Sequence, residues 1–273
     1  MTTRAGMRTR LKSTQLRDLY AALGALKEQE QTALAELHAK EPERLIARFA
    51  HSVDTVAGYQ ANTEAFHDRA RTTGLRETLD EPPVPLNDRV KTADVARHLA
   101  NARERRVENA PELDFRFVDR EIFALRTTKS DTDRPRRRIM DLLLVSRDGL
   151  PIVGELKIGT DKPTYFALVQ ALMYAAELSS PAQRERLMKH YPDADFAFPK
   201  GGPFLDVYLI GFDPPSKGKY RERSFEATRS ISSKLVKDTR VHSVIRRIAY
   251  IEAEAQDQGL SFVKRFAFEP SPT

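Results

Sequence analysis

The sequence predicts an α/β protein in which a mixed central β-sheet is flanked by helices and preceded by an all-α N-terminal module. Three observations predict this organisation. Apolar residues recur at helical spacing through residues 1–80, prolines crowd the segment "DEPPVPLNDR", and apolar runs of strand length follow it. The chain therefore divides into a helical module (1–80), a linker (81–91) and an α/β domain (92–273).

In the N-terminal module, apolar side chains recur every three or four residues, as they do on one face of a helix. They begin with Leu16, Leu19, Tyr20, Leu23 and Leu26. Pro42 suits the first turn of another helix, and a further helix is expected to end near Gly74. Helix packing is the simplest role for this apolar stripe. A homo-oligomer seam or a docking surface for a protein partner is the alternative.

The α/β domain begins with a predicted helix at 92–109, for which Thr92 can serve as the N-cap. Half-exposed strands are expected where apolar and polar residues alternate, and buried strands where apolar residues are continuous. The alternating runs are 113–118 and 121–128, and the continuous runs are 139–146, 150–158 and 203–214. Apolar patterning predicts helices at 163–178 and 239–257 and a last strand at 260–268.

The composition indicates which cellular compartment and which class of partner suit the chain. The 273 residues include no cysteine, which excludes disulfides and thiolate zinc sites and suits a reducing cytoplasm. We expect no signal peptide and no membrane span, because no apolar run is long enough to cross a bilayer. The formal net charge of +6 favours a polyanionic partner such as nucleic acid, although an ordinary, slightly basic cytosolic protein carries a similar charge.

Two neighbouring strands carry charged residues at their ends. Asp141 opens the first strand, whereas Glu155 and Lys157 close the second. The turn "RDG" predicts a hairpin, in which Gly149 is free to adopt a positive φ angle. Glu155 and Lys157 project to one face because they are two residues apart, and the hairpin brings Asp141 beside them. The alternative is a solvated hairpin end with a surface salt bridge between Asp141 and Lys157.

Two carboxylates beside an ammonium group suit a hard divalent cation and a phosphate substrate. Mg²⁺ prefers oxygen ligands, which Asp141, Glu155 and the backbone carbonyl of Leu156 can provide, and Mn²⁺ is expected to substitute for it. The ion would polarise a phosphoryl oxygen. Lys157 would place positive charge beside the attacking water or the developing phosphate charge.

These residues resemble the active-site hairpin of the PD-(D/E)xK nucleases. Asp141 is followed, after thirteen residues, by Glu155-Leu156-Lys157. Met140 stands where that superfamily often has a proline. The resemblance implies a restriction-endonuclease-like fold, phosphodiester hydrolysis and products that carry 5′-phosphates.

The next predicted helix extends the resemblance. Gln170 and Tyr174 lie one helical turn apart and face the same way, which resembles the Q-x-x-x-Y motif of the RecB-like branch. The resemblance implies that the glutamine lines the active site and that the tyrosine lies near it. It covers about residues 92–180 and does not reach the N-terminal module.

The leading helix of the superfamily often supplies a further acid. Glu104 and Glu108 are both available, and Glu104 is preferred because it lies deeper in the predicted helix. Two basic segments are expected to hold nucleic-acid phosphates, with solvated surface loops as the alternative. Their residues are Arg134, Arg136, Arg137, Arg138, Lys217, Lys219 and Arg221.

Together these features predict a Mg²⁺-dependent nuclease. The expected substrate is DNA, cut internally, in a bacterial or phage setting of defence, restriction or repair. Two alternatives stay open. One is a catalytically silent nucleic-acid-binding or assembly module of the same fold, and the other is an RNA-directed nuclease.

Overall fold

The computed structural model describes most of the chain. The described residues are 15–57, 85–86, 90–101, 104–122, 124, 139–159, 163–213, 224–256 and 259–270. The α-helices are α2 (Leu16–Leu23), α3 (Glu28–Lys40), α4 (Glu43–Ala57), α6 (Thr92–Ala100), α7 (Thr164–Leu178), α8 (Pro181–His190), α9 (Phe225–Leu235) and α10 (Thr239–His242). The strands are β1 (Val107–Glu108), β2 (Phe115–Ile122), β3 (Met140–Ser146), β4 (Pro151–Ile158), β5 (Leu205–Phe212), β6 (Ile245–Gln256) and β7 (Gly259–Phe268). Short 3-10 helices span Pro111–Leu113 and Pro192–Ala194.

Within these ranges the strands form one curled, seven-stranded sheet in the order β1-β7-β6-β5-β4-β3-β2. The central strands β4, β5 and β6 run parallel, whereas β3 and β7 join them antiparallel. The sheet is therefore mixed and flanked by helices, and this prediction is confirmed. Every residue of β5 and most of β4 are buried, because helices or curled sheet cover both faces. This burial explains why both strands are continuously apolar.

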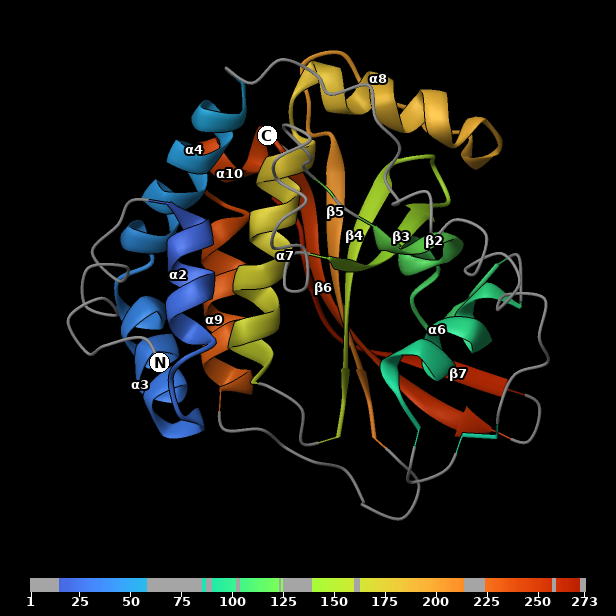
Figure 1. The fold of residues 1–273 in the computed structure, drawn as a ribbon, viewed down its shortest axis with the longest axis horizontal. Helices are drawn as coiled ribbons and strands as arrows, with labels where there is room; N and C mark the ends of the chain where they lie inside the picture. The colour runs from blue at the N-terminus through green and yellow to red at the C-terminus, as the bar shows by residue number, and fades with distance from the viewer. Residues whose placement is uncertain are drawn as a thin grey trace.

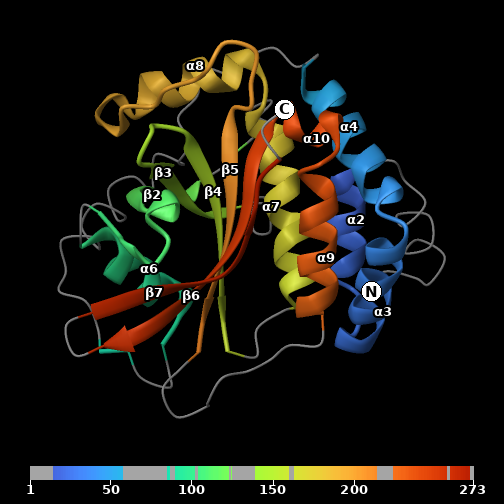
Figure 2. The same cartoon turned by 180° about the vertical axis from the view of Figure 1, so that it is seen from behind.

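The helices cover the two faces of the sheet unequally. Figures 1 and 2 show α2, α3, α4, α7 and α9 stacked on one face and α6 on the other, with α8 at one end. Each face has its own hydrophobic core, and the larger core contains all of the apolar residues of α7. Every helix in the described ranges is too short or too polar to cross a membrane.

The N-terminal helices share the larger core with the rest of the chain. Leu19 of α2 and Phe49 of α4 belong to the same buried cluster as the side chains of α7. Arg17 of α2 also forms an ion pair of 2.7 Å with Glu177 of α7. Residues 16–57 are therefore packed as an outer layer of the α/β fold. The predicted linker lies mostly outside the described residues, so a domain boundary there stays a prediction.

Three sequence predictions differ from the structure. The helix predicted at 239–257 is wrong, because only α10 is helical and the following residues form β6. The helix predicted at 92–109 ends already at Ala100, where Asn101 caps α6. The runs 113–118 and 121–128 give one strand, β2, as far as the chain is described. In each case pairing or packing with distant segments overrides the local pattern.

Candidate active site

The candidate site lies at the end of the β3–β4 hairpin that is remote from its turn. The ladder between the strands ends with the pair Leu142–Gly154, so Asp141 and Glu155 occupy the next opposite positions. Odd-numbered side chains near the middle of both strands belong to the core beneath α7. Because side chains alternate along a strand, Asp141, Glu155 and Lys157 all project toward α7.

The carboxylate of Asp141 forms a hydrogen bond with the backbone of β4 just beyond the end of the β3–β4 ladder. Its Oδ2 atom accepts a hydrogen bond of 3.1 Å from the backbone N–H of Leu156. The N–H and C=O of one strand residue point toward the same neighbouring strand. The carbonyl of Leu156 is therefore directed toward the same side as Asp141, where a cation held by that carboxylate would reach it.

Lys157 joins the two acids and the predicted glutamine. Its Nζ atom lies 3.3 Å from Oε2 of Glu155 and 3.7 Å from Oδ2 of Asp141. The same ammonium donates a hydrogen bond of 3.4 Å to Oε1 of Gln170, which comes from α7. Asp141, Glu155, Lys157 and Gln170 therefore converge on one point, as the sequence predicts.

Burial distinguishes this cluster from a surface salt bridge. The side chain of Glu155 is fully buried, whereas those of Asp141 and Lys157 are 22% and 21% exposed. Burial and the neighbouring carboxylate of Asp141 raise the pKa of Glu155 well above its ordinary value. Burial acts to lower the pKa of Lys157, but the two acids outweigh it and raise the pKa, so Lys157 stays an ammonium ion.

Helix α7 covers the side of the site that faces away from the sheet. Gln170 and Tyr174 are both buried on this helix, which is buried along its whole length. Burial, and then the nearby charge of Glu155, raise the pKa of Tyr174 well above its ordinary value. Its hydroxyl is buried and has no hydrogen-bond partner among the described residues. The Q-x-x-x-Y pair therefore lies beside the acids, with the glutamine in direct contact with Lys157.

One atom in the cluster is suited to binding a cation. Oε1 of Glu155 is buried and has no hydrogen-bond partner in the described part of the chain. A buried carboxylate oxygen without a donor is costly, and a divalent cation would satisfy it. Asp141 and the Leu156 carbonyl complete an oxygen donor set. The described residues hold no group of three or more His, Cys, Asp or Glu at metal-binding distance, so water or substrate would complete the shell.

The remaining predicted residues are not gathered at this point. Glu104 is exposed and lies beyond the end of α6, so its predicted place deep in a helix is wrong. Glu108 lies in β1, at the opposite edge of the sheet from β2. The predicted phosphate-binding residues all lie outside the described residues. They are Arg134, Arg136, Arg137, Arg138, Lys217, Lys219 and Arg221.

Sequence reasoning missed two tyrosines near Lys157. Tyr20 of α2 packs against Phe166 of α7 with ring centroids 5.0 Å apart, and it is close enough to affect the pKa of Lys157. Nothing in the sequence separates Tyr20 from the other apolar residues of its helix. Tyr250 of β6 reaches over Gly211, which pairs with Lys157 across β4 and β5. A glycine inside a buried strand was the available signal for that close approach.

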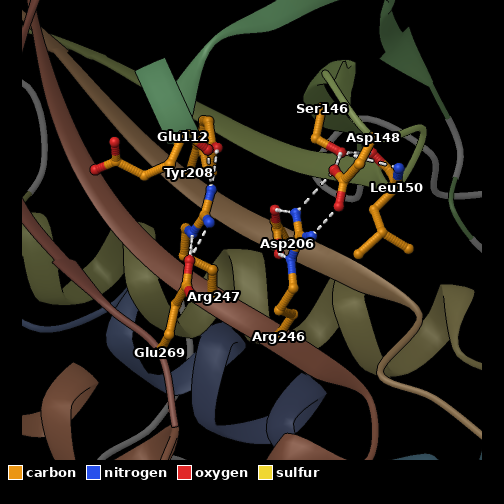
Figure 3. Close-up of polar contacts among 9 residues, drawn as sticks. All are labelled: Glu112, Ser146, Asp148, Leu150, Asp206, Tyr208, Arg246, Arg247 and Glu269. Carbon is orange, nitrogen blue, oxygen red and sulfur yellow. Dashed lines mark hydrogen bonds and ion pairs between the residues drawn. The ribbon is translucent and has the colours of Figure 1, made fainter. Parts of the chain in front are cut away.

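A second polar cluster occupies the other end of the strands, where the β3–β4 turn meets β5 and β6 (Figure 3). Arg246 bonds both carboxylate oxygens of the buried Asp206, at 3.0 and 2.6 Å, and also pairs with Asp148 in the turn. Asp148 in turn accepts a hydrogen bond of 2.6 Å from Ser146. Here the buried acid is fully paired, so this cluster fixes the hairpin and leaves no oxygen for a ligand.

Comparison of the chain with protein-family models, with curated proteins and with solved structures finds no match. The resemblance to the PD-(D/E)xK nucleases therefore rests on the motif residues and stays a prediction.

Proposed function

We propose that the chain is a Mg²⁺-dependent nuclease of PD-(D/E)xK type, with a restriction-endonuclease-like fold and a RecB-like Q-x-x-x-Y helix. One observation carries the proposal. The carboxylates of Asp141 and Glu155 and the amide oxygen of Gln170, from two strands and a helix, all contact Lys157. One oxygen of the buried Glu155 carboxylate has no hydrogen-bond partner among the described residues. A salt bridge on a solvated hairpin end would not bury Glu155 completely.

The residues have distinct roles in this proposal. Asp141, Glu155 and the Leu156 carbonyl would hold the cation, which supplies Lewis-acid activation of water and phosphate when it is bound. Lys157 stays protonated between two acids, so it donates hydrogen bonds and stabilises developing negative charge rather than removing a proton. Gln170 accepts a hydrogen bond from Lys157 and thereby orients the ammonium toward the scissile phosphate.

DNA is the proposed substrate, cut internally, in a bacterial or phage context of defence, restriction or repair. The net charge of +6 supports a polyanionic substrate, since phosphates supply most of the affinity in such complexes. The first experiment therefore compares DNA with RNA as substrates.

The purified chain is incubated with supercoiled plasmid, linear duplex, single-stranded DNA and RNA, in Mg²⁺, Mn²⁺ or EDTA. We expect plasmid linearisation in Mg²⁺ and Mn²⁺ and none in EDTA. Asp141→Asn is the matched variant, since it keeps the shape of the side chain and removes its charge. Tight binding of duplex without cleavage of any substrate would favour the silent binding module. Cleavage of RNA alone would favour the RNA-directed nuclease.

A further inference from the structure

Helix α2 packs along α7 on the face that carries Gln170. Arg17, near the start of α2, pairs at 2.7 Å with Glu177, near the end of α7. Gly24, directly after α2, lies beside Phe166 in the first turn of α7, since a Cβ atom built on Gly24 would be 4.0 Å from that ring. The two helices are therefore antiparallel neighbours, as seen in Figure 1. Phe166, Gln170 and Glu177 are four and seven residues apart, so they share one face of α7.

Tyr20 lies between these two contacts, near the middle of α2. Its ring packs on that of Phe166, with centroids 5.0 Å apart, and aromatic contacts of this kind fix the position of a ring. Gln170 follows Phe166 by one helical turn, and Gln170 is the residue of α7 that accepts a hydrogen bond from Lys157. The ring of Tyr20 is therefore placed beside the turn of α7 that meets Lys157.

The electrostatics of the site agree with this placement. Burial, and then the charge of Glu155, are the largest causes of the raised pKa of Tyr174, and Tyr20 is the next. Tyr20 also acts on the pKa of Lys157, after burial and the two acids. Such effects fall with distance, so Tyr20 is a neighbour of both groups.

The contact between Gln170 and Lys157 depends on the packing around it. Its length of 3.4 Å is above the usual range for a hydrogen bond, so it contributes little attraction of its own. Gln170 is nevertheless buried, and the side chain of Lys157 is only 21% exposed. Tyr20 is half-buried, and its hydroxyl is uncharged at neutral pH. Its contribution to the site is therefore the bulk of the ring.

We infer that α2 forms one wall of the active site and that Tyr20 is a positioning residue, whose ring keeps Gln170 in contact with Lys157. This inference rests on the proposed nuclease function. It extends the site to the N-terminal helices, which the resemblance to the PD-(D/E)xK nucleases does not reach. Tyr20 acts through Gln170 and Lys157 and does not hold the DNA strand itself, so its loss affects kcat and leaves binding unchanged.

The test measures steady-state cleavage of duplex DNA in Mg²⁺ by wild type and three variants. Tyr20→Ala should lower kcat about tenfold, within the range for a small displacement of a catalytic group, with KM unchanged. Tyr20→Phe keeps the ring and should cleave nearly as fast as wild type. Leu19→Ala is the matched control. It shortens a buried side chain of the same helix, so it should lower the melting temperature without changing kcat measured well below that temperature.

Melting temperatures identify any variant that has lost its fold, and Tyr20→Leu, which fills more of the space, replaces Tyr20→Ala in that case. Equal kcat values for Tyr20→Ala and wild type overturn the inference while the nuclease proposal stands. An equal loss of kcat in Leu19→Ala also overturns it, because any loosening of α2 would then lower activity. An equal loss in Tyr20→Phe overturns the role of the ring. If wild type cleaves no nucleic acid, the nuclease proposal fails and the inference fails with it.

Discussion

Nζ of Lys157 lies 3.3 Å from Oε2 of Glu155, while Oε1 of the same carboxylate has no hydrogen-bond partner among the described residues. The lysine therefore neutralises one half of a fully buried acid and leaves the other half available. In the Asp206–Arg246 pair, by contrast, both carboxylate oxygens are bonded to one guanidinium. The two oxygens of Glu155 are therefore paired unequally, and the proposed cation site depends on this difference.

Replacing Lys157 tests the charge that acts during cleavage. Lys157→Ala should lower kcat by at least about two orders of magnitude, because it removes the cation that faces the developing phosphate charge. The variant also leaves the buried Glu155 without its cation, so its melting temperature should fall, and kcat is measured well below that temperature. Lys189→Ala, an exposed lysine on α8, is the control and should cleave like wild type. Equal kcat values for Lys157→Ala and wild type would show that the site is elsewhere.

Glu155→Gln should separate stability from function. The pKa of Glu155 is raised in the folded state, so the charged form destabilises the protein increasingly as the pH rises above the ordinary value near 4.5. The glutamine variant should therefore unfold with a free energy about 1–2 kcal/mol higher than wild type at pH 7 without metal, while losing cleavage. Denaturant melts at several pH values provide the measurement.

Metal addition gives the matching comparison for the same variant. Mg²⁺ or Mn²⁺ should raise the melting temperature of wild type, since a ligand that binds only the folded state stabilises it. Glu155→Gln should show a much smaller rise. An equal rise in both proteins would mean that the ions bind elsewhere.

His38 should make stability depend on pH in the acidic range. Burial, and then the charges of Arg48 and Arg44, lower the pKa of His38 from 6.5 to about 4. Its Nδ1 lies 2.5 Å from the hydroxyl of Tyr165, whose raised pKa keeps the proton on that oxygen, so neutral His38 accepts the hydrogen bond. The neutral form is the stable one in the folded protein. Stability should therefore be full above about pH 6.5 and should fall by about 3 kcal/mol toward pH 4.

His38→Gln is the variant that checks this pH dependence. Glutamine can still accept the hydrogen bond from Tyr165 but does not titrate. The difference in unfolding free energy between wild type and variant should shrink steadily from pH 7 to pH 4. A constant difference across that range would contradict the assignment to His38.

Replacing Arg246 should lower the free energy of unfolding, because its partner Asp206 is buried. Arg246→Ala leaves the fully buried Asp206 without a cation, which should lower the free energy of unfolding by about 3 kcal/mol at pH 7. Asp206→Asn combined with Arg246→Met should recover part of that loss, because no charge then remains buried. Urea melts of the single and double variants measure both effects. A double variant less stable than Arg246→Ala would contradict the explanation.

Local patterns in the sequence were sufficient for the candidate site but not for the whole sheet. The hairpin and α7 were predicted because a tight turn and continuous apolar runs are local signals. Gln170 meets Lys157 because the helix follows the hairpin directly. Residues that are close in sequence thus build most of the cluster.

Strand β6 shows that the local sequence pattern does not always decide between a helix and a strand. Its apolar residues are spaced in a way that also suits an amphipathic helix, so the period does not decide between the two structures. The choice depends on β5 and β7, which pair with β6 on both sides. Arg247 illustrates the reason, since its partners Glu112 and Glu269 lie far from it in the sequence. Such non-local pairing also explains why the position of Tyr250 over Gly211 does not follow from the sequence.

The packing of α2, α3 and α4 on α7 constrains the order in which the chain can fold during synthesis. Arg17 and Glu177 are 160 residues apart, and Ala39 and Lys234 are 195 apart. During synthesis the N-terminal helices leave the ribosome long before their partners and expose apolar faces meanwhile, a situation that favours slow folding and chaperone binding. The residues of the acid–lysine cluster lie within 141–170, whereas β5 and β6, which extend the sheet beside it, emerge only with the last third of the chain. The sheet around the cluster is therefore completed after the cluster residues have been made.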